Sequence, residues 1–93
     1  MGYTFEWDAK KAESNRRKHG VTFDEASTVF GDPLAVLLSD PDHSRGERRY
    51  LLLGMSTRRR LLVVAFAERP LGTRLISARR AARKERRRYE EEG

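Results

Sequence analysis

The 93-residue chain contains no cysteine, one tryptophan, two histidines and three prolines. Without cysteine it forms no disulfide framework and no thiolate metal site. No stretch stays apolar over the about 20 residues that a membrane-spanning helix needs, so we expect no contact with a membrane. The first residues lack a basic segment followed by an apolar one, and we expect no signal peptide and a cytoplasmic location. A chain of this length predicts one domain over residues 1–93.

Charge is distributed unevenly along the chain. The formal net charge is +6. Residues 1–44 hold 5 Lys and Arg against 8 Asp and Glu, whereas residues 45–93 hold 15 against 6. Such asymmetry indicates a surface that meets a polyanion, and RNA is the best candidate. A solvated basic surface without a partner is the plainer alternative.

Two helices are predicted in the N-terminal half. Asp8 is a good N-cap for a helix that ends at His19, because Gly20 supplies a left-handed stop. Thr22 and Glu25 form a T-x-x-E capping box that opens a second helix.

The remaining pattern predicts an α+β fold. Short alternating or apolar runs with intervening turns predict strands at residues 3–7, 34–39, 48–55, 61–68 and 73–78. A polar loop over residues 40–46 separates the second of these strands from the third. The last three strands follow one another through short turns, and we expect an antiparallel meander.

Residues 79–91 predict a final helix with an unfavourable order of charges. Arg79, Arg80 and Arg83 stand at its start and glutamates at its end. The helix macrodipole favours the opposite arrangement by a few tenths of a kcal/mol or more per charge. Helix stability therefore does not explain these arginines, which favours contact with a ligand or partner.

Several kinds of catalytic site are missing from the sequence. There is no P-loop and no G-x-G-x-x-G motif, and the two histidines, His19 and His43, lie far apart. Asp40 and Asp42 are typical turn residues beside a proline. Because we find no convincing set of converging carboxylates, we expect neither a metal ion nor a cofactor.

One group of polar residues lies on a single face of the first predicted helix. Lys11, Asn15 and Lys18 are spaced by four and three residues, and His19 follows Asn15 by four. Trp7 stands just before the helix. Such a group can stack on a base and hold a phosphate. Alternatively, Trp7 is part of the core, and His19 interacts with the helix dipole.

A second group is rich in arginine, whose guanidinium binds phosphate in a bidentate manner and stays charged. Alternate residues of a strand face one way, so one row can present guanidiniums while the other supplies core. The members are Arg48, Arg49, Arg58, Arg59, Arg60, Glu68, Arg69, Arg74, Arg79 and Arg80.

The order of these residues along the chain resembles the BrnT toxins, nearly from end to end. The residues that carry the resemblance are Phe5-Glu6-Trp7-Asp8, Lys11, Asn15, Lys18-His19-Gly20-Val21-Thr22-Phe23, Phe30-Gly31-Asp32-Pro33, Glu47-Arg48, Arg60-Leu61-Leu62-Val63-Val64, Glu68-Arg69, Ile76-Ser77-Ala78-Arg79-Arg80-Ala81, Glu85 and Tyr89. Each motif is weak alone, but the ordered set is specific. Two segments depart from the pattern: residues 70–73, where we expect a tighter polar turn, and residues 65–67, where relatives often carry a hydroxyl or histidine.

The resemblance implies a RelE-like fold and the toxin of a type II toxin–antitoxin system. It implies a ribonuclease that blocks translation. It also implies a BrnA-type antitoxin as partner, whose ribbon-helix-helix part binds DNA. We expect a heterotetrameric complex that contacts DNA only through the antitoxin.

The residues and the resemblance together predict metal-independent RNA cleavage, in which the ribose 2′-OH attacks the adjacent phosphate. His19 and Glu68 are the alternative bases. The expected catalytic residues are His19, Glu68, Arg69 and Arg79. The expected substrate-binding residues are Trp7, Lys11, Asn15, Lys18, Arg48 and Arg80.

Two other functions fit the same composition. The chain can be a non-catalytic module that binds RNA or the ribosome, because a basic half suits binding as well as cleavage. It can also be an interaction protein only, in which case its RNA affinity would not fall steeply with salt.

Overall fold

The computed structural model describes residues 4–38 and 48–92. The polar loop expected over residues 40–46, with Asp40, Asp42 and His43, lies outside the described residues, as does Glu47. The helices and strands follow in the order β1 (Phe5–Glu6), α1 (Ala9–His19), α2 (Phe23–Thr28), the 3₁₀ turn η1 (Val29–Gly31), β2 (Val36–Leu38), β3 (Arg49–Met55), β4 (Leu61–Arg69), β5 (Gly72–Arg80) and α3 (Arg83–Glu92).

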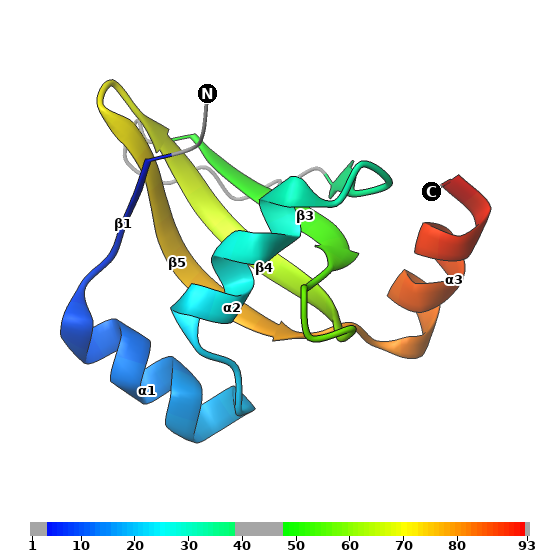
Figure 1. Cartoon of the computed structure of the whole chain (residues 1–93), viewed down its shortest axis with the longest axis horizontal. Helices are drawn as coiled ribbons and strands as arrows, with labels where there is room; N and C mark the ends of the chain where they lie inside the picture. Colours follow the sequence, from blue (N-terminus) through cyan, green and yellow to red (C-terminus); the bar gives the residue numbers. More distant parts are fainter. Residues whose placement is uncertain (1–3, 39–47, 93) are drawn as a thin grey trace.

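The described strands form one sheet in the order β1-β5-β4-β3-β2 (Figure 1). β3, β4 and β5 pair antiparallel, as predicted for the meander, and β2 also pairs antiparallel with β3. β1 pairs with β5 in parallel and makes the sheet mixed. The predicted antiparallel meander therefore accounts for β3, β4 and β5 but not for the parallel pairing of β1. A parallel pair joins distant segments of the chain, so no short turn in the sequence indicates it. Gly72, at φ 158°, lets β1 come close, because a Cβ there would lie 2.6 Å from the Thr4 carbonyl oxygen.

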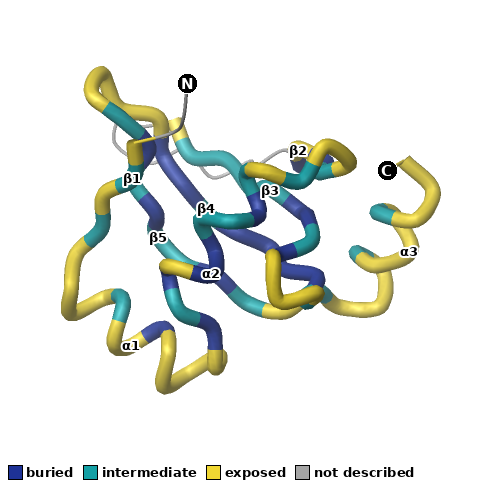
Figure 2. The backbone as a smooth tube through the Cα atoms, viewed as in Figure 1, coloured by how far each residue is buried: buried dark blue, intermediate teal, exposed yellow. Residues whose placement is uncertain are grey.

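Both faces of the sheet are covered by apolar side chains. Leu62 and Val64 of β4 pack against α2 in one core, and their neighbours Leu61 and Val63 belong to a second core on the other face. Tyr89 of α3 packs against that second core. β4 is accordingly buried along most of its length, whereas α1 and α3 are largely exposed (Figure 2). Burial on both faces explains why β4 reads as a continuous apolar run rather than an alternating one.

Both N-terminal helices begin as predicted. The Asp8 carboxylate accepts from the Lys10 N–H at 2.8 Å, and Gly20 ends α1 at φ 71°. The Thr22 hydroxyl accepts from the Glu25 N–H at 3.1 Å. The carboxylate of Glu25, however, binds Ser56 and Arg60 instead of closing the expected capping box.

The final helix begins later than predicted. Arg79 and Arg80 belong to β5, and α3 begins at Arg83. Glu85 in its first turn accepts from the Ala82 N–H at 2.7 Å, which is the favourable placement for a carboxylate. Arg79 and Arg80 therefore lie outside the final helix. The helix macrodipole does not act on them as predicted, so the charge order of the helix is not evidence that they contact a ligand or partner.

Candidate functional site

A hollow of about 190 Å³ lies between α1 and β5. Four of the residues grouped by helical spacing line it together, and β5 adds two more. Its lining residues are Lys11, Ser14, Asn15, Lys18, His19, Ile76 and Ser77. The hollow thus combines one imidazole, two ammonium groups and two hydroxyls, which suits the binding of a phosphate.

The β5 wall of the hollow is shaped by an irregularity of the strand. Phe66 of β4 pairs with Leu75, but the next residue, Ala65, pairs with Ser77. Ile76 is therefore an extra residue, a β-bulge. In a regular strand, consecutive side chains point to opposite faces, whereas here both Ile76 and Ser77 line the hollow.

Asn15 joins the two walls of the hollow. Its side-chain amide donates to the Ala78 carbonyl at 2.9 Å, and its oxygen accepts from the Ala78 N–H at 3.0 Å. The second amide hydrogen goes to the Val21 carbonyl at 3.0 Å. The side chain thus pairs with β5 as a neighbouring strand would, beyond the end of β1. Asn15 is 6% exposed, and both of its side-chain hydrogens are used within the chain, so it positions α1 and has no donor left for a substrate.

Removal of this amide is expected to destabilise the fold. In an Asn15→Ala variant, the buried N–H and C=O of Ala78 lose their partners, at a cost of about 1–3 kcal/mol for each unsatisfied group. We expect the free energy of unfolding to fall by about 2–4 kcal/mol in urea titrations followed by circular dichroism. Ser14→Ala, in the adjacent exposed position, is the matched control, and an equal loss in that variant would contradict the role of the amide.

Glu68 and Arg69 are not among the residues that line the hollow beside His19. Glu68 stands opposite Thr73, whose hydroxyl donates to it at 3.3 Å, close to the turn between β4 and β5. Arg79 pairs with Val63, five residues along β4 from Glu68, which corresponds to about 17 Å at 3.4 Å per residue. The four residues expected to be catalytic therefore do not converge on one site.

Arg79 forms an ion pair with the final helix. Its two terminal nitrogens donate to the two carboxylate oxygens of Glu85, each at 2.8 Å. The hydrogen bonds with Glu85 raise the pKa of Arg79, and those with Arg79 lower the pKa of Glu85. This pair ties the first turn of α3 to β5, so that the Arg79 charge is already compensated inside the chain.

The other predicted contact residues are dispersed. Arg48 precedes β3, and Arg80 ends β5 opposite Leu62; both are exposed. Trp7 lies on the other side of α1 from His19, where its ring meets that of Phe23 edge to face at 5.8 Å. The structure therefore places Lys11, Asn15, Lys18 and His19 together, and it separates them from the remaining candidates.

Ser77 and the bulge at Ile76 were not among the sequence-based site residues. The strand pattern of residues 73–78 gives no sign of a bulge, since no glycine or proline marks it. Glu25 was predicted from the sequence only as part of the capping box of the second helix. Its ion pair with Arg60 links residues 35 positions apart, and local spacing cannot indicate such a contact.

Residues 7–85 match the sequence profile of the family described as the ribonuclease toxin BrnT of type II toxin–antitoxin systems. The chain belongs to the BrnT family. Ribonuclease activity is the activity described for this family. Membership implies an RNA substrate and an antitoxin partner.

The crystal structure of the BrnT ribonuclease toxin of Brucella abortus has the same fold as this BrnT-family chain. The TM-score is 0.65 at 22% sequence identity, and the match covers 85% of this chain and 96% of the Brucella toxin. A search of curated proteins finds no match. Within residues 4–38 and 48–92, no helix of the chain is long and apolar enough to span a membrane, and no three His, Asp or Glu side chains converge as a metal site.

Proposed function

We propose that this BrnT-family chain is a metal-independent endoribonuclease that cleaves RNA in the hollow between α1 and β5. The observation that carries the proposal is the meeting of His19 with Lys11 and Lys18 in that hollow. An imidazole can take and give protons near neutral pH, and two ammonium groups beside it favour a bound phosphate. Glu68, the alternative base, lies at the β4–β5 turn without these cations.

The chemistry needs no group beyond those of the chain and the RNA. His19 accepts the proton of the ribose 2′-OH while that oxygen bonds to the adjacent phosphorus. The bond from phosphorus to the 5′ oxygen breaks, and this oxygen takes a proton from the imidazolium or from water. The products are a 2′,3′-cyclic phosphate and a 5′-OH. Lys11 and Lys18 stabilise the extra negative charge of the transition state.

The remaining basic residues supply long-range attraction. Arg48, Arg69 and Arg80 are exposed, and α3 adds Arg83, Arg86 and further cations on its solvent side. A strand of RNA that neutralises several such charges releases counterions, so binding should weaken steeply as salt is raised.

The cellular role follows from the family. We infer that cleavage inhibits translation in the cytoplasm and that the chain has the RelE-like form of the α+β fold. We further infer that a BrnA-type ribbon-helix-helix antitoxin neutralises the toxin in a heterotetramer and supplies its contact with DNA.

An assay of the purified protein on single-stranded RNA in the presence of EDTA tests the proposal. We expect cleavage to persist, with 2′,3′-cyclic phosphate ends, because proton transfer and charge stabilisation come from side chains. Cleavage that stops in EDTA and returns only with Mg²⁺ would contradict metal independence. Salt-sensitive binding of RNA that is never cleaved would favour the non-catalytic RNA- or ribosome-binding module instead.

A further inference from the structure

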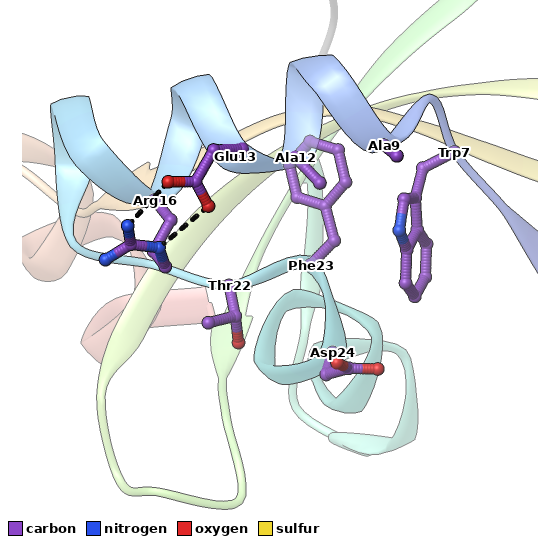
Figure 3. A pocket seen from close by; sticks show the side chains of 8 residues that line it. All are labelled: Trp7, Ala9, Ala12, Glu13, Arg16, Thr22, Phe23 and Asp24. Carbon is purple, nitrogen blue, oxygen red and sulfur yellow. Dashed lines mark hydrogen bonds and ion pairs between the residues drawn. The ribbon is translucent and has the colours of Figure 1, made fainter.

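A second hollow, of about 250 Å³, lies on the opposite side of α1 from His19, between the first turns of α1 and the start of α2 (Figure 3). This volume is just below the about 300–1,000 Å³ of pockets that hold drug-sized ligands, so it suits a single small ring system. The lining residues are Trp7, Ala9, Ala12, Glu13, Arg16, Thr22, Phe23 and Asp24.

One side of this hollow is aromatic. The partly exposed ring of Trp7 stands edge to face with the buried ring of Phe23. Ala9 and Ala12 lie three residues apart, on the same side of α1. Their short side chains leave the space beside the indole open (Figure 3). Aromatic side chains of this kind are the surfaces on which unstacked RNA bases rest.

The rest of the lining carries hydrogen-bonding groups of both kinds. The side chain of Asp24 is exposed, and the nearby Ser27 hydroxyl donates to the main-chain oxygen of Asp24 rather than to its carboxylate. Arg16 donates from Nε and one terminal nitrogen to Glu13, at 3.1 and 2.6 Å. A guanidinium has five N–H groups, so Arg16 keeps donors beyond these two.

We propose that this hollow binds an unstacked guanine of the RNA substrate, an inference that rests on the ribonuclease function proposed above. The base stacks on Trp7, the Asp24 carboxylate accepts from its N1–H and its 2-amino group, and Arg16 donates to O6. Guanine alone among the four bases presents two adjacent donors, which match the two oxygens of a carboxylate. Adenine and cytosine place a ring-nitrogen acceptor beside their amino group, and uracil places carbonyl oxygens on both sides of its N–H.

The position of the hollow fits a role in substrate choice rather than in bond cleavage. A helix with its side chains is about 10–12 Å across, and α1 alone separates this hollow from the one that contains His19. An RNA strand with its scissile phosphate beside His19 can cross α1 and place a base, a few nucleotides away, on Trp7. Asp24 and Trp7 then select the sequence that His19 cleaves.

Trp7 is the single tryptophan of the chain, so its fluorescence reports directly on this hollow. The probes are 2′-O-methyl pentanucleotides of uridine whose central nucleotide is guanosine, inosine, adenosine or uridine; they lack the attacking hydroxyl and are not cleaved. We expect the guanine probe to quench Trp7 at the lowest concentration. Inosine lacks the 2-amino group, and we expect about tenfold weaker binding, with adenine and uracil weaker still.

The Asp24→Asn variant tests the carboxylate. We expect about tenfold weaker binding of the guanine probe, with the difference between guanine and inosine largely lost. Glu90→Gln removes the same charge from the exposed side of α3 and should leave both values unchanged. In cleavage assays of mixed-sequence RNA, Asp24→Asn should lose its preference for sites near guanine while cleavage elsewhere continues.

Three outcomes would overturn the proposal. One is equal quenching by all four probes, and another is unchanged affinity in Asp24→Asn. The third is quenching by the antitoxin but by none of the probes, which would assign the hollow to the protein partner. None of them concerns the cleavage step, because the probes cannot react. Conversely, a His19 variant that cleaves normally would overturn the proposed function while leaving the Trp7 titration intact.

Discussion

His19→Ala is expected to cleave RNA about a hundredfold or more slowly than the unchanged chain. General acid–base catalysis by a positioned side chain contributes typically about 10²–10⁴-fold, and His19 is the imidazole in the hollow between α1 and β5. Single-turnover cleavage in EDTA measures the chemical step, and circular dichroism checks that the fold persists. RNA binding should change little, because Lys11 and Lys18 remain in place.

Arg17→Ala is the matched control for this experiment. Arg17 lies on the same helix, is well exposed, and contacts Glu13 at 3.5 Å without lining the hollow. Its loss removes a positive charge near His19 but no group from the proposed site, so cleavage should stay within a few-fold. If His19→Ala cleaves normally and Glu68→Ala does not, the base lies at the β4–β5 turn and the proposed site is wrong.

Helical spacing and capping predicted which residues line the α1 side of this hollow. Lys11, Asn15, Lys18 and His19 came together because the cap at Asp8 and the stop at Gly20 fix the helix, and a fixed helix fixes which residues share a face. These signals are local in sequence.

The β5 side of the hollow could not be predicted in the same way. The pairing of Ser77 with Ala65 depends on the register of two strands and on the extra residue Ile76, and a register is decided by packing across the whole sheet. The same limit applies to Glu68 and Arg79. Glu68 was predicted as the alternative base to His19, and Arg79 as a further catalytic residue, yet β4 and β5 hold Glu68 and Arg79 about 17 Å apart.

Asn15 lies among the residues with which helical spacing grouped it, but its side chain bonds to the backbone of Val21 and Ala78. Its spacing placed it on the face with the lysines, which the structure bears out, and an amide beside two cations suggested contact with a base. The strand β1 ends after pairing with Arg74, however, and leaves the later backbone of β5 to be satisfied by another group. Only the tertiary structure shows that Asn15 fills this place.

The largest expected loss of stability follows from the pair of Glu25 and Arg60. Glu25 is 4% exposed, and its carboxylate accepts from Arg60 through two nitrogens and from the Ser56 hydroxyl at 2.7 Å. Arg60 also donates to the Gly20 carbonyl at 3.1 Å. One ion pair thus joins α2 to the β3–β4 turn and to the end of α1, next to His19.

In a Glu25→Ala variant, we expect the free energy of unfolding to fall by about 3–5 kcal/mol, the typical cost of leaving one partner of a buried pair uncompensated. Small domains have about 5–15 kcal/mol in total, so the variant should be close to unfolding at physiological temperature. Urea titrations followed by Trp7 fluorescence measure the loss. Glu13→Ala breaks an exposed pair with Arg16 and should change stability far less, as surface pairs do.

The pH dependence separates the charge of Glu25 from its shape. The hydrogen bonds from Arg60, opposed by burial and helped by Ser56, lower the pKa of Glu25 below its ordinary value of 4.5. A carboxyl whose pKa is lower in the folded state contributes stability that is present above the unfolded pKa and is lost as pH falls through the folded one. The difference in stability between the unchanged chain and Glu25→Gln should therefore be largest near neutral pH and shrink below about pH 4.5. A difference that stays constant from pH 7 to pH 3 would show that packing, and not the carboxylate charge, holds α1, α2 and the β3–β4 turn together.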